Sequence, residues 1–351
     1  MLYQSWWKIL GAFLLVYTFL AGLLVPLKPG IVSVSPSSAR TGEELELLVS
    51  GYNTRYTQSR GNLRAWLKLD DAHALSAHEV HILDDRQLRL AFSLPTHLPA
   101  REKVRDFTLV LDDPYNGATV LPSAVFVTQA DISPEKGEKA FKNAPLRRLH
   151  DKAGIDYPFR NILKETIRNT YFHVPLWFAM IFLFLYSFAQ SIRYLRQGDA
   201  DADLRAQALT MTGILYGVLG LLTGAIWAKH TWGAYWSWDV KQNMTAVALL
   251  IYLAYFVLRG SFEDPEKKAR LAAVYNIFAF CALIPLIYVV PRLTDSLHPG
   301  SGGNPAFGSD DLDNTMRMVF YPAIIGWTLL GFWAASLVYR YERLKVHVEE
   351  R

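Results

Sequence analysis

Aromatic side chains are concentrated in one short stretch of the sequence, Trp227-Ala-Lys-His-Thr-Trp-Gly-Ala-Tyr-Trp-Ser-Trp-Asp239. If this stretch is helical, Trp232, Trp236 and Asp239 fall at positions i, i+4 and i+7 and share one helix face. Such a face is an aromatic shelf that ends in a carboxylate, and it offers stacking area to a large, flat, apolar ligand such as a porphyrin. The alternative is a belt of aromatic residues at a lipid interface. A belt leaves the interleaved Gly233 and Asp239 unexplained.

Two histidines outside this stretch could complete a porphyrin site. His173 stands in Tyr171-Phe-His-Val-Pro-Leu-Trp177, and His298 stands in Asp295-Ser-Leu-His-Pro-Gly300. Each histidine alone is more typical of a polar residue at an interface, but a pair that flanks an aromatic shelf favours two axial ligands to a haem iron. Cys281 is the only cysteine, so the paired thioether links of a c-type cytochrome cannot form in this chain. We therefore predict noncovalent binding of b-type haem through the two histidines.

The elements that must position these residues are long apolar segments. Hydrophobic residues make up 51% of the 351 residues, whereas charged residues make up only 19%. Six apolar runs approach the length of about 20 residues that a helix needs to cross a bilayer. They cover residues 9–27, 174–191, 208–227, 244–258, 271–290 and 319–339. No small-residue cleavage site follows Leu27, so we expect the first run to be an uncleaved helix and not a secretory signal.

Basic residues in the short loops indicate the orientation of these helices, because loops rich in Lys and Arg stay on the cytoplasmic side. The basic segments are the loops after the second and fourth runs and the C-terminal tail. Their basic residues are Arg193, Arg196 and Arg205, then Arg259, Lys267, Lys268 and Arg270, then Arg340, Arg343, Lys345 and Arg351. We expect a multi-pass membrane protein with both termini in the cytoplasm. The two histidines and the tryptophan-rich stretch then lie at the outer face.

A β-rich segment separates the first two apolar runs. Stretches such as Glu44–Val49, Leu63–Lys68 and Phe107–Leu111 alternate in polarity and are divided by Gly, Asn, Asp and Pro, which is typical of a small β-sandwich. The opening Ile31-Val-Ser-Val-Ser-Pro36 resembles the immunoglobulin-like modules called IPT or TIG domains. The predicted fold class is thus an all-α polytopic membrane bundle of six transmembrane helices with an inserted extracytoplasmic β-sandwich of immunoglobulin-like type.

The predicted domain boundaries follow from this division. Residues 1–28 form the first transmembrane helix, 29–129 the extracytoplasmic insert, 130–167 a linker, and 168–345 a five-helix haem-handling core. Within the linker, the amphipathic stretches Glu135–Phe141 and Leu146–His150 predict one or two surface helices near the membrane.

The residues of the shelf carry a resemblance to a known family. Trp232-Gly-Ala-Tyr-Trp-Ser-Trp-Asp239 looks like the signature of the WWD family of haem-handling membrane proteins. With six helices, His173 before Val-Pro and His298 before Pro-Gly, the chain resembles CcmC, the haem-delivery subunit of System I cytochrome c maturation. The resemblance covers the first helix and residues 168–340. It implies that His173 and His298 are axial ligands and that the shelf comprises Trp232, Gly233, Tyr235, Trp236, Trp238 and Asp239.

Two departures from the family pattern bear on the site and its partners. Lys241 stands where an arginine is common, and it can neutralise a haem propionate as a point charge. The β-rich insert replaces a short first outer loop. The resemblance implies a location in a bacterial inner (cytoplasmic) membrane, with the insert in the periplasm. It implies as partners the membrane lipid, a periplasmic haem chaperone that receives the haem, and the subunits of an ABC transporter. The chain has no P-loop motif, so ATP hydrolysis belongs to another chain.

The predicted function is haem binding and delivery, and not enzyme catalysis. One alternative is a haem lyase of the same superfamily, which ligates haem directly to apocytochrome c. Another is a membrane-anchored adhesion or scaffold protein in which the sandwich is the functional part. The net charge of +4 forms no basic stripe, so nucleic-acid binding is not expected.

Five further histidines have weaker claims to a site. His73, His78, His81 and His97 are spread through the predicted sandwich, where solvated residues are more typical than metal ligands. His230 adjoins the shelf and is a candidate spare ligand or hydrogen-bond partner.

Overall fold

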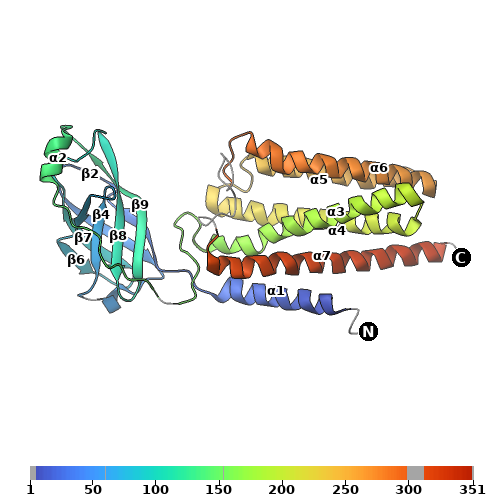
Figure 1. The fold of residues 1–351 in the computed structure, drawn as a ribbon, viewed down its shortest axis with the longest axis horizontal. Coiled ribbons are helices and arrows are strands. Elements are labelled where there is room, and N and C mark those ends of the chain that lie inside the picture. Colours follow the sequence, from blue (N-terminus) through green and yellow to red (C-terminus); the bar gives the residue numbers. More distant parts are fainter. Residues whose placement is uncertain (1–4, 60, 153, 299–311, 350–351) are drawn as a thin grey trace. The chain divides into compact units, whose positions relative to one another are not determined.

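The computed structural model describes residues 5–59, 61–152, 154–298 and 312–349. The chain divides into two compact units (Figure 1). The helical unit comprises Met1–Val25 with Glu165–Arg351, and the β unit comprises Pro26–Lys164. The chain thus leaves the helical unit after one helix and returns to it after the β unit.

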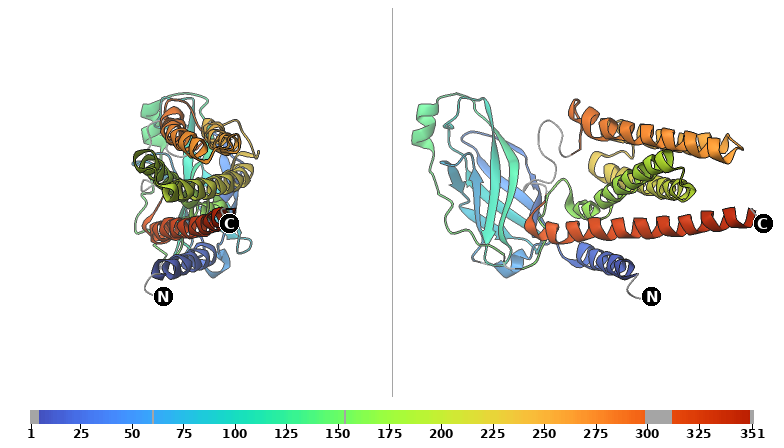
Figure 2. Two further views of the ribbon diagram at one scale, coloured as in Figure 1. Left: turned by 90° about the vertical axis from the view of Figure 1, so that its right-hand side faces the viewer. Right: turned by 45° about the vertical axis from the view of Figure 1, so that its right-hand side comes forward.

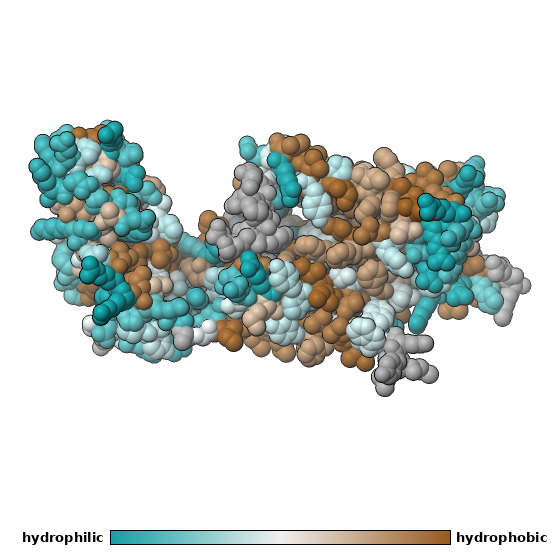
Figure 3. Space-filling view, viewed as in Figure 1, coloured by the Kyte–Doolittle hydropathy of each residue, from teal (hydrophilic) through white to brown (hydrophobic). Residues whose placement is uncertain are grey.

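Six helices in the described part of the chain are long and apolar enough to cross a membrane. They are α1 (Trp6–Leu24), α3 (His173–Gln197), α4 (Ala200–Trp232), α5 (Val240–Gly260), α6 (Pro265–Ile284) and α7 (Asn314–Glu349). Short helical turns adjoin them, namely η3 (Lys164–Tyr171), η4 (Pro285–Val289) and η5 (Val290–Arg292). On the face shown in Figure 3, apolar side chains cover much of the middle of the helical unit. The predicted membrane bundle of six helices is therefore confirmed.

The helices from α3 to α7 run in alternating directions (Figures 1 and 2). The starts of α3, α5 and α7 therefore lie at the same end of the bundle as the ends of α4 and α6. At the opposite end, the guanidinium of Arg259 on α5 donates to both carboxylate oxygens of Asp203 on α4, at 2.7 and 2.5 Å. This bidentate contact fixes the two helices relative to each other.

Two sheets form the β unit, in the strand orders β1-β3-β7-β6 and β2-β9-β8-β4-β5. The strands are β1 (Gly30–Ser35), β2 (Ser38–Arg40), β3 (Glu44–Tyr52), β4 (Arg64–Lys68), β5 (Ala74–Ser76), β6 (Glu79–Ile82), β7 (Gln87–Ser93), β8 (Val104–Asp113) and β9 (Gly117–Thr128), and a short turn, η2 (Tyr56–Ser59), follows β3. In β3, Leu45, Leu47 and Val49 are buried, whereas Glu46 and Leu48 between them are exposed, as the period of two requires. Apolar side chains from both sheets share one core. The predicted β-sandwich is confirmed, whereas its likeness to IPT or TIG modules stays a prediction.

The segment after the last strand was predicted to hold one or two surface helices. A helix forms at α2 (Pro134–Ala140), but Leu146–His150 is not helical. Leu146 packs against Trp66 and Val110 on the outer face of the five-stranded sheet. Arg64 donates to the backbone carbonyls of the two arginines that follow Leu146, at 3.2 and 2.8 Å. These contacts hold a segment without regular secondary structure, so only the first of the two amphipathic stretches forms a helix, within the one or two predicted.

Candidate functional site

The residues singled out by the sequence gather at one end of the helical unit, which we call the site end. His173 is the first residue of α3, Trp232 is the last residue of α4, and Asp239 is the N-cap of α5. His298 lies in the segment that follows η5. The Pro-Gly pair that comes next in the predicted motif lies outside the described residues.

The tryptophan-rich stretch is not one continuous helix, so the predicted common face of Trp232, Trp236 and Asp239 is wrong. Helix α4 ends at Trp232, because Gly233 follows with a φ of +85°, the left-handed conformation that glycine adopts at helix C-termini. Residues 234–239 are not helical. Trp232 and Asp239 therefore reach the site end from two different helices.

Asp239 is the centre of the hydrogen bonds at the site end. Its carboxylate accepts from the backbone N–H of Lys241 at 2.9 Å, which caps α5. It also accepts from the Ser296 hydroxyl at 2.9 Å and from the Leu297 N–H at 2.8 Å. Nδ1 of His298 lies 2.8 Å from Oδ1 of the same carboxylate. One buried carboxylate thus joins the segment after η5 to the start of α5.

The charge states of Asp239 and His298 follow from their surroundings. Burial opposes ionisation of Asp239, but the N–H of Leu297 and the neighbouring imidazole outweigh it, and the pKa of the carboxyl lies below its ordinary value. Burial lowers the pKa of His298 and outweighs the attraction of the carboxylate. Near pH 7 the pair is a carboxylate and a neutral imidazole. Because a carboxylate only accepts, Nδ1 of His298 carries the proton and Nε2 carries the lone pair.

Two indole rings of α4 surround the His298 ring. Trp232 meets it edge to face, with ring centroids 4.7 Å apart, and Trp227 lies at 6.2 Å with its plane tilted by 37°. The two indoles also contact each other at 4.9 Å. A compact cluster of Trp227, Trp232 and His298 therefore takes the place of the predicted continuous shelf.

His173 is held by α4 and by its own helix. Its Nδ1 lies 3.0 Å from the hydroxyl oxygen of Thr223, and the indole N–H of Trp177 donates to its Nε2 at 3.2 Å. The imidazole lies over Gly224, where a Cβ would stand 2.7 Å from its Cε1. Gly220, one turn earlier, leaves the same space for the indole of Trp177. The sequence Gly220-Leu-Leu-Thr-Gly224 thus lets α3 approach α4 closely, as small residues do in membrane bundles.

The two imidazoles lie beside successive turns of α4. His173 packs over Gly224 and His298 packs beside Trp227. These two positions are separated by about 4.5 Å of helix rise. The structure therefore brings both predicted ligands to one end of one helix.

The remaining predicted residues occupy the loop between α4 and α5 and the first turn of α5. Tyr235 and Trp238 are 60% and 78% exposed, and Trp236 and Lys241 are half-buried. Trp236 and Trp238 contact each other edge to face, with centroids 6.5 Å apart. Gln242 accepts from the N–H and the hydroxyl of Ser237, which braces the loop from α5. Among the described residues, these loop rings make no ring contact with either imidazole.

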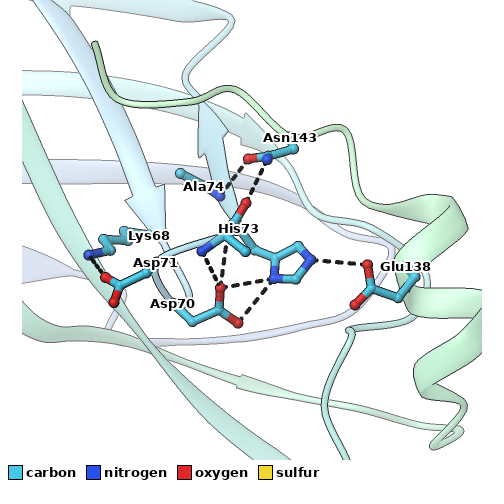
Figure 4. Close-up of polar contacts among 8 residues, drawn as sticks. Lys68, Asp70, Asp71, His73, Ala74, Glu138 and Asn143 are labelled. Atoms are coloured by element: carbon cyan, nitrogen blue, oxygen red, sulfur yellow. Dashed lines mark hydrogen bonds and ion pairs between the residues drawn. The ribbon is translucent and has the colours of Figure 1, made fainter. Parts of the chain in front are cut away.

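The histidines of the β unit form no comparable site. His73 lies between two carboxylates, with Nδ1 2.9 Å from Asp70 and Nε2 3.1 Å from Glu138 (Figure 4). Burial lowers the pKa of His73, but the hydrogen bonds with Glu138 and Asp70 outweigh it and raise the pKa above its ordinary value. Because the two carboxylates meet opposite ring nitrogens, they hold an imidazolium and tie α2 to the turn before β5. Nowhere in the described residues do three His, Cys, Asp or Glu side chains gather as a metal site.

Five contributors to the site end were not predicted as such: Trp177, Thr223, Gly224, Trp227 and Ser296. The spacing of Gly220 and Gly224 is a sequence signal for close helix packing, and it points to the surface on which His173 lies. No pattern along the sequence connects Ser296 to Asp239, because the two belong to segments far apart in the chain.

The donor set at the site end suits a metal that brings most of its own ligands. The described residues offer two neutral imidazole nitrogens there, and they contain no group of three His, Cys, Asp or Glu side chains that could hold a metal ion. A haem iron already has four porphyrin nitrogens and needs only two axial ligands. The indoles of Trp227 and Trp232 supply apolar surface for the ring.

Comparisons with known proteins match the helical unit. The family model described as "CcmC: Heme exporter protein C" matches residues 157–351. The "Heme exporter protein C" of Bradyrhizobium diazoefficiens is 31% identical over 167 residues, which cover 47% of this chain and 62% of that protein. That of Paracoccus denitrificans is 27% identical over 187 residues, covering 53% and 75%. That of Escherichia coli K12 is 27% identical over 150 residues, covering 43% and 58%. The family match begins at residue 157, so it leaves out α1, which the resemblance was expected to cover.

Proposed function

The chain belongs to the CcmC family, heme exporter protein C, and from this membership we propose that it binds haem noncovalently at the site end and delivers it to a periplasmic haem chaperone for cytochrome c maturation. The observation that carries the proposal is that both imidazoles have the same hydrogen-bond arrangement. His173 and His298 each direct Nδ1 to an oxygen, of Thr223 and of Asp239 respectively. This arrangement makes Nε2 the nitrogen that can bind iron, because an oxygen that accepts from one ring nitrogen of a histidine orients the other toward a metal.

The roles of the side chains follow from their positions. His173 and His298 supply the axial ligands of b-type haem, and Asp239 positions His298. Trp227 and Trp232 provide stacking surface beside His298. Tyr235, Trp236 and Trp238, with Gly233 allowing the turn, extend this surface along the exposed loop. Lys241 neutralises a propionate.

The site end faces the periplasm in this proposal, and the opposite end faces the cytoplasm. The support is the distribution of basic residues, which lie near the ends of α3 and α5, near the starts of α4 and α6, and in the C-terminal part of α7. The protein then sits in the lipid of the bacterial inner membrane with both termini cytoplasmic and the β unit periplasmic. Its further partners are the subunits of an ABC transporter. These subunits hydrolyse ATP, for which the sequence of this chain has no P-loop motif.

A transfer assay distinguishes delivery from ligation. Haem-loaded protein in lipid nanodiscs is mixed with apocytochrome c alone, with a soluble haem chaperone alone, or with both. We expect haem to appear on the chaperone and no thioether-linked haem to form on apocytochrome c alone. Covalent product in the absence of the chaperone would establish a haem lyase instead, and transfer that persists without His173 and His298 would refute the site.

Gly224→Ala is expected to weaken haem binding by about tenfold. The new Cβ would stand 2.7 Å from Cε1 of His173, so the ring must shift, and overpacking of this kind costs about 1–3 kcal/mol. The dissociation constant is measured by absorbance titration of the haem-free protein. Gly260→Ala is the control, because a Cβ there meets nothing within 4 Å. Equal affinities for the two variants would show that the His173 ring does not depend on this space.

A further inference from the structure

The hydrogen bonds of His173 fix which of its nitrogens carries the proton. The single hydroxyl proton of Thr223 is directed to the backbone carbonyls of Leu219 and Gly220, at 2.9 and 3.1 Å. The hydroxyl oxygen therefore accepts from Nδ1 of His173 at 3.0 Å. The indole of Trp177 is a donor only, so Nε2 of His173 accepts from it at 3.2 Å. The ring is held neutral with its proton on Nδ1, which is the form that binds iron through Nε2.

The lone pair of His173 that iron needs is thus already engaged by an indole N–H. His298 differs in this respect. Its Nδ1 is bound by the carboxylate of Asp239 at 2.8 Å, and its Nε2 has no hydrogen-bond partner among the described residues. Iron meets an available lone pair on His298, whereas on His173 it must displace the Trp177 N–H.

We propose that Trp177 is a positioning residue that caps Nε2 of His173 and makes His173 the exchangeable ligand of the bound haem. This inference rests on the proposed function. When the iron–Nε2 bond of His173 breaks, the indole N–H of Trp177 donates a hydrogen bond to the lone pair of Nε2. No proton or electron is transferred. His298, backed by a carboxylate, keeps the haem while the His173 side opens. Release of haem to an acceptor therefore starts at His173.

The geometry also explains why the cap stays in place when haem is absent. Trp177 lies one helical turn after His173 on α3, so the two side chains share a face. Their rings meet at 85° with centroids 5.9 Å apart. The space over Gly220 holds the indole, where a Cβ would stand 2.7 Å from its ring. The donor is thus held beside the acceptor by α4.

Trp177→Phe tests the cap, because it keeps an aromatic ring over Gly220 and removes the N–H. We expect the haem dissociation constant to fall by about fivefold, the factor that corresponds to one net hydrogen bond of about 1 kcal/mol. In the reduced protein, the concentration of carbon monoxide that displaces half of the sixth ligand should rise by the same factor. Trp327→Phe is the matched control, since the Trp327 indole N–H is buried without a hydrogen-bond partner in the described structure.

The outcomes separate the cap from the proposed function. A wild-type protein that binds no haem refutes the proposed function. A wild-type protein that binds haem, with Trp177→Phe no tighter than Trp327→Phe, overturns the cap. If Trp177→Phe does not fold, benzothienylalanine incorporated at position 177 replaces only the N–H by sulfur, and unchanged affinity in that protein overturns the cap equally.

Discussion

His173→Ala and His298→Ala are each expected to lower haem affinity by more than about 100-fold and to convert six-coordinate, low-spin haem to a five-coordinate form. The reason is the loss of one of two axial nitrogens, whereas even an outer partner of a metal ligand is worth about 10- to 100-fold in affinity. The double variant should bind no haem at the site end. Absorbance titration in lipid nanodiscs gives the dissociation constants, and the spectra give the coordination number.

Two further measurements make this prediction specific. Added imidazole should restore a six-coordinate spectrum in either single variant, because a free imidazole can occupy the open axial position. His230→Ala is the control: His230 lies near the end of α4, the helix beside which both imidazoles pack, but is exposed. A six-coordinate spectrum that survives both histidine substitutions, or that is lost only with His230→Ala, would contradict the assignment of the ligands.

Asp239→Ala is expected to weaken haem binding by about 10- to 100-fold, although both iron ligands remain in the sequence. The substitution removes the acceptor of His298 Nδ1, and it also releases Ser296 and the Leu297 N–H from the same carboxylate. The imidazole then loses both its orientation and the fixed tautomer that leaves Nε2 for iron. The helix cap on α5 is lost as well, at a cost of about 1 kcal/mol.

Asp264→Ala separates the loss of the cap from the loss of the ligand's support. Asp264 caps α6 by accepting from the backbone N–H of Lys267 at 2.7 Å, at the opposite end of the bundle. Both variants should lose similar thermal stability, but only Asp239→Ala should lose haem affinity. If the two variants bind haem equally well, Asp239 acts as a helix cap alone.

The elements of the fold could be predicted because each has a local signature. Six apolar runs of nearly membrane-spanning length became six helices, and the alternation of Glu44–Val49 became β3. The helix boundaries were harder to predict from the sequence. Helix α4, for example, begins at Ala200, eight residues before its apolar run. The non-helical course of Leu146–His150 is set by packing on Trp66 and Val110. Such contacts between distant segments override a local helical pattern.

The candidate site was predictable in its residue types and less so in their roles. The tryptophans, the histidine pair and Asp239 stand out by composition and spacing. The assumption that the stretch is one helix failed at Gly233, where a single residue with positive φ ends α4. Asp239 consequently caps α5 and holds His298, a partner 59 residues away. The hydrogen bonds of Thr223 and Trp177 to His173 could not be predicted, because they form only where α3 packs against α4.

The most direct measurement is the absorption spectrum of the wild-type protein, purified in lipid nanodiscs from haem-replete cells and recorded oxidised and reduced. The account predicts one noncovalently bound b-type haem per chain, extractable into acidified organic solvent, with the low-spin spectrum of two imidazole ligands. A colourless protein, or a haem with a five-coordinate spectrum in both oxidation states, would contradict it.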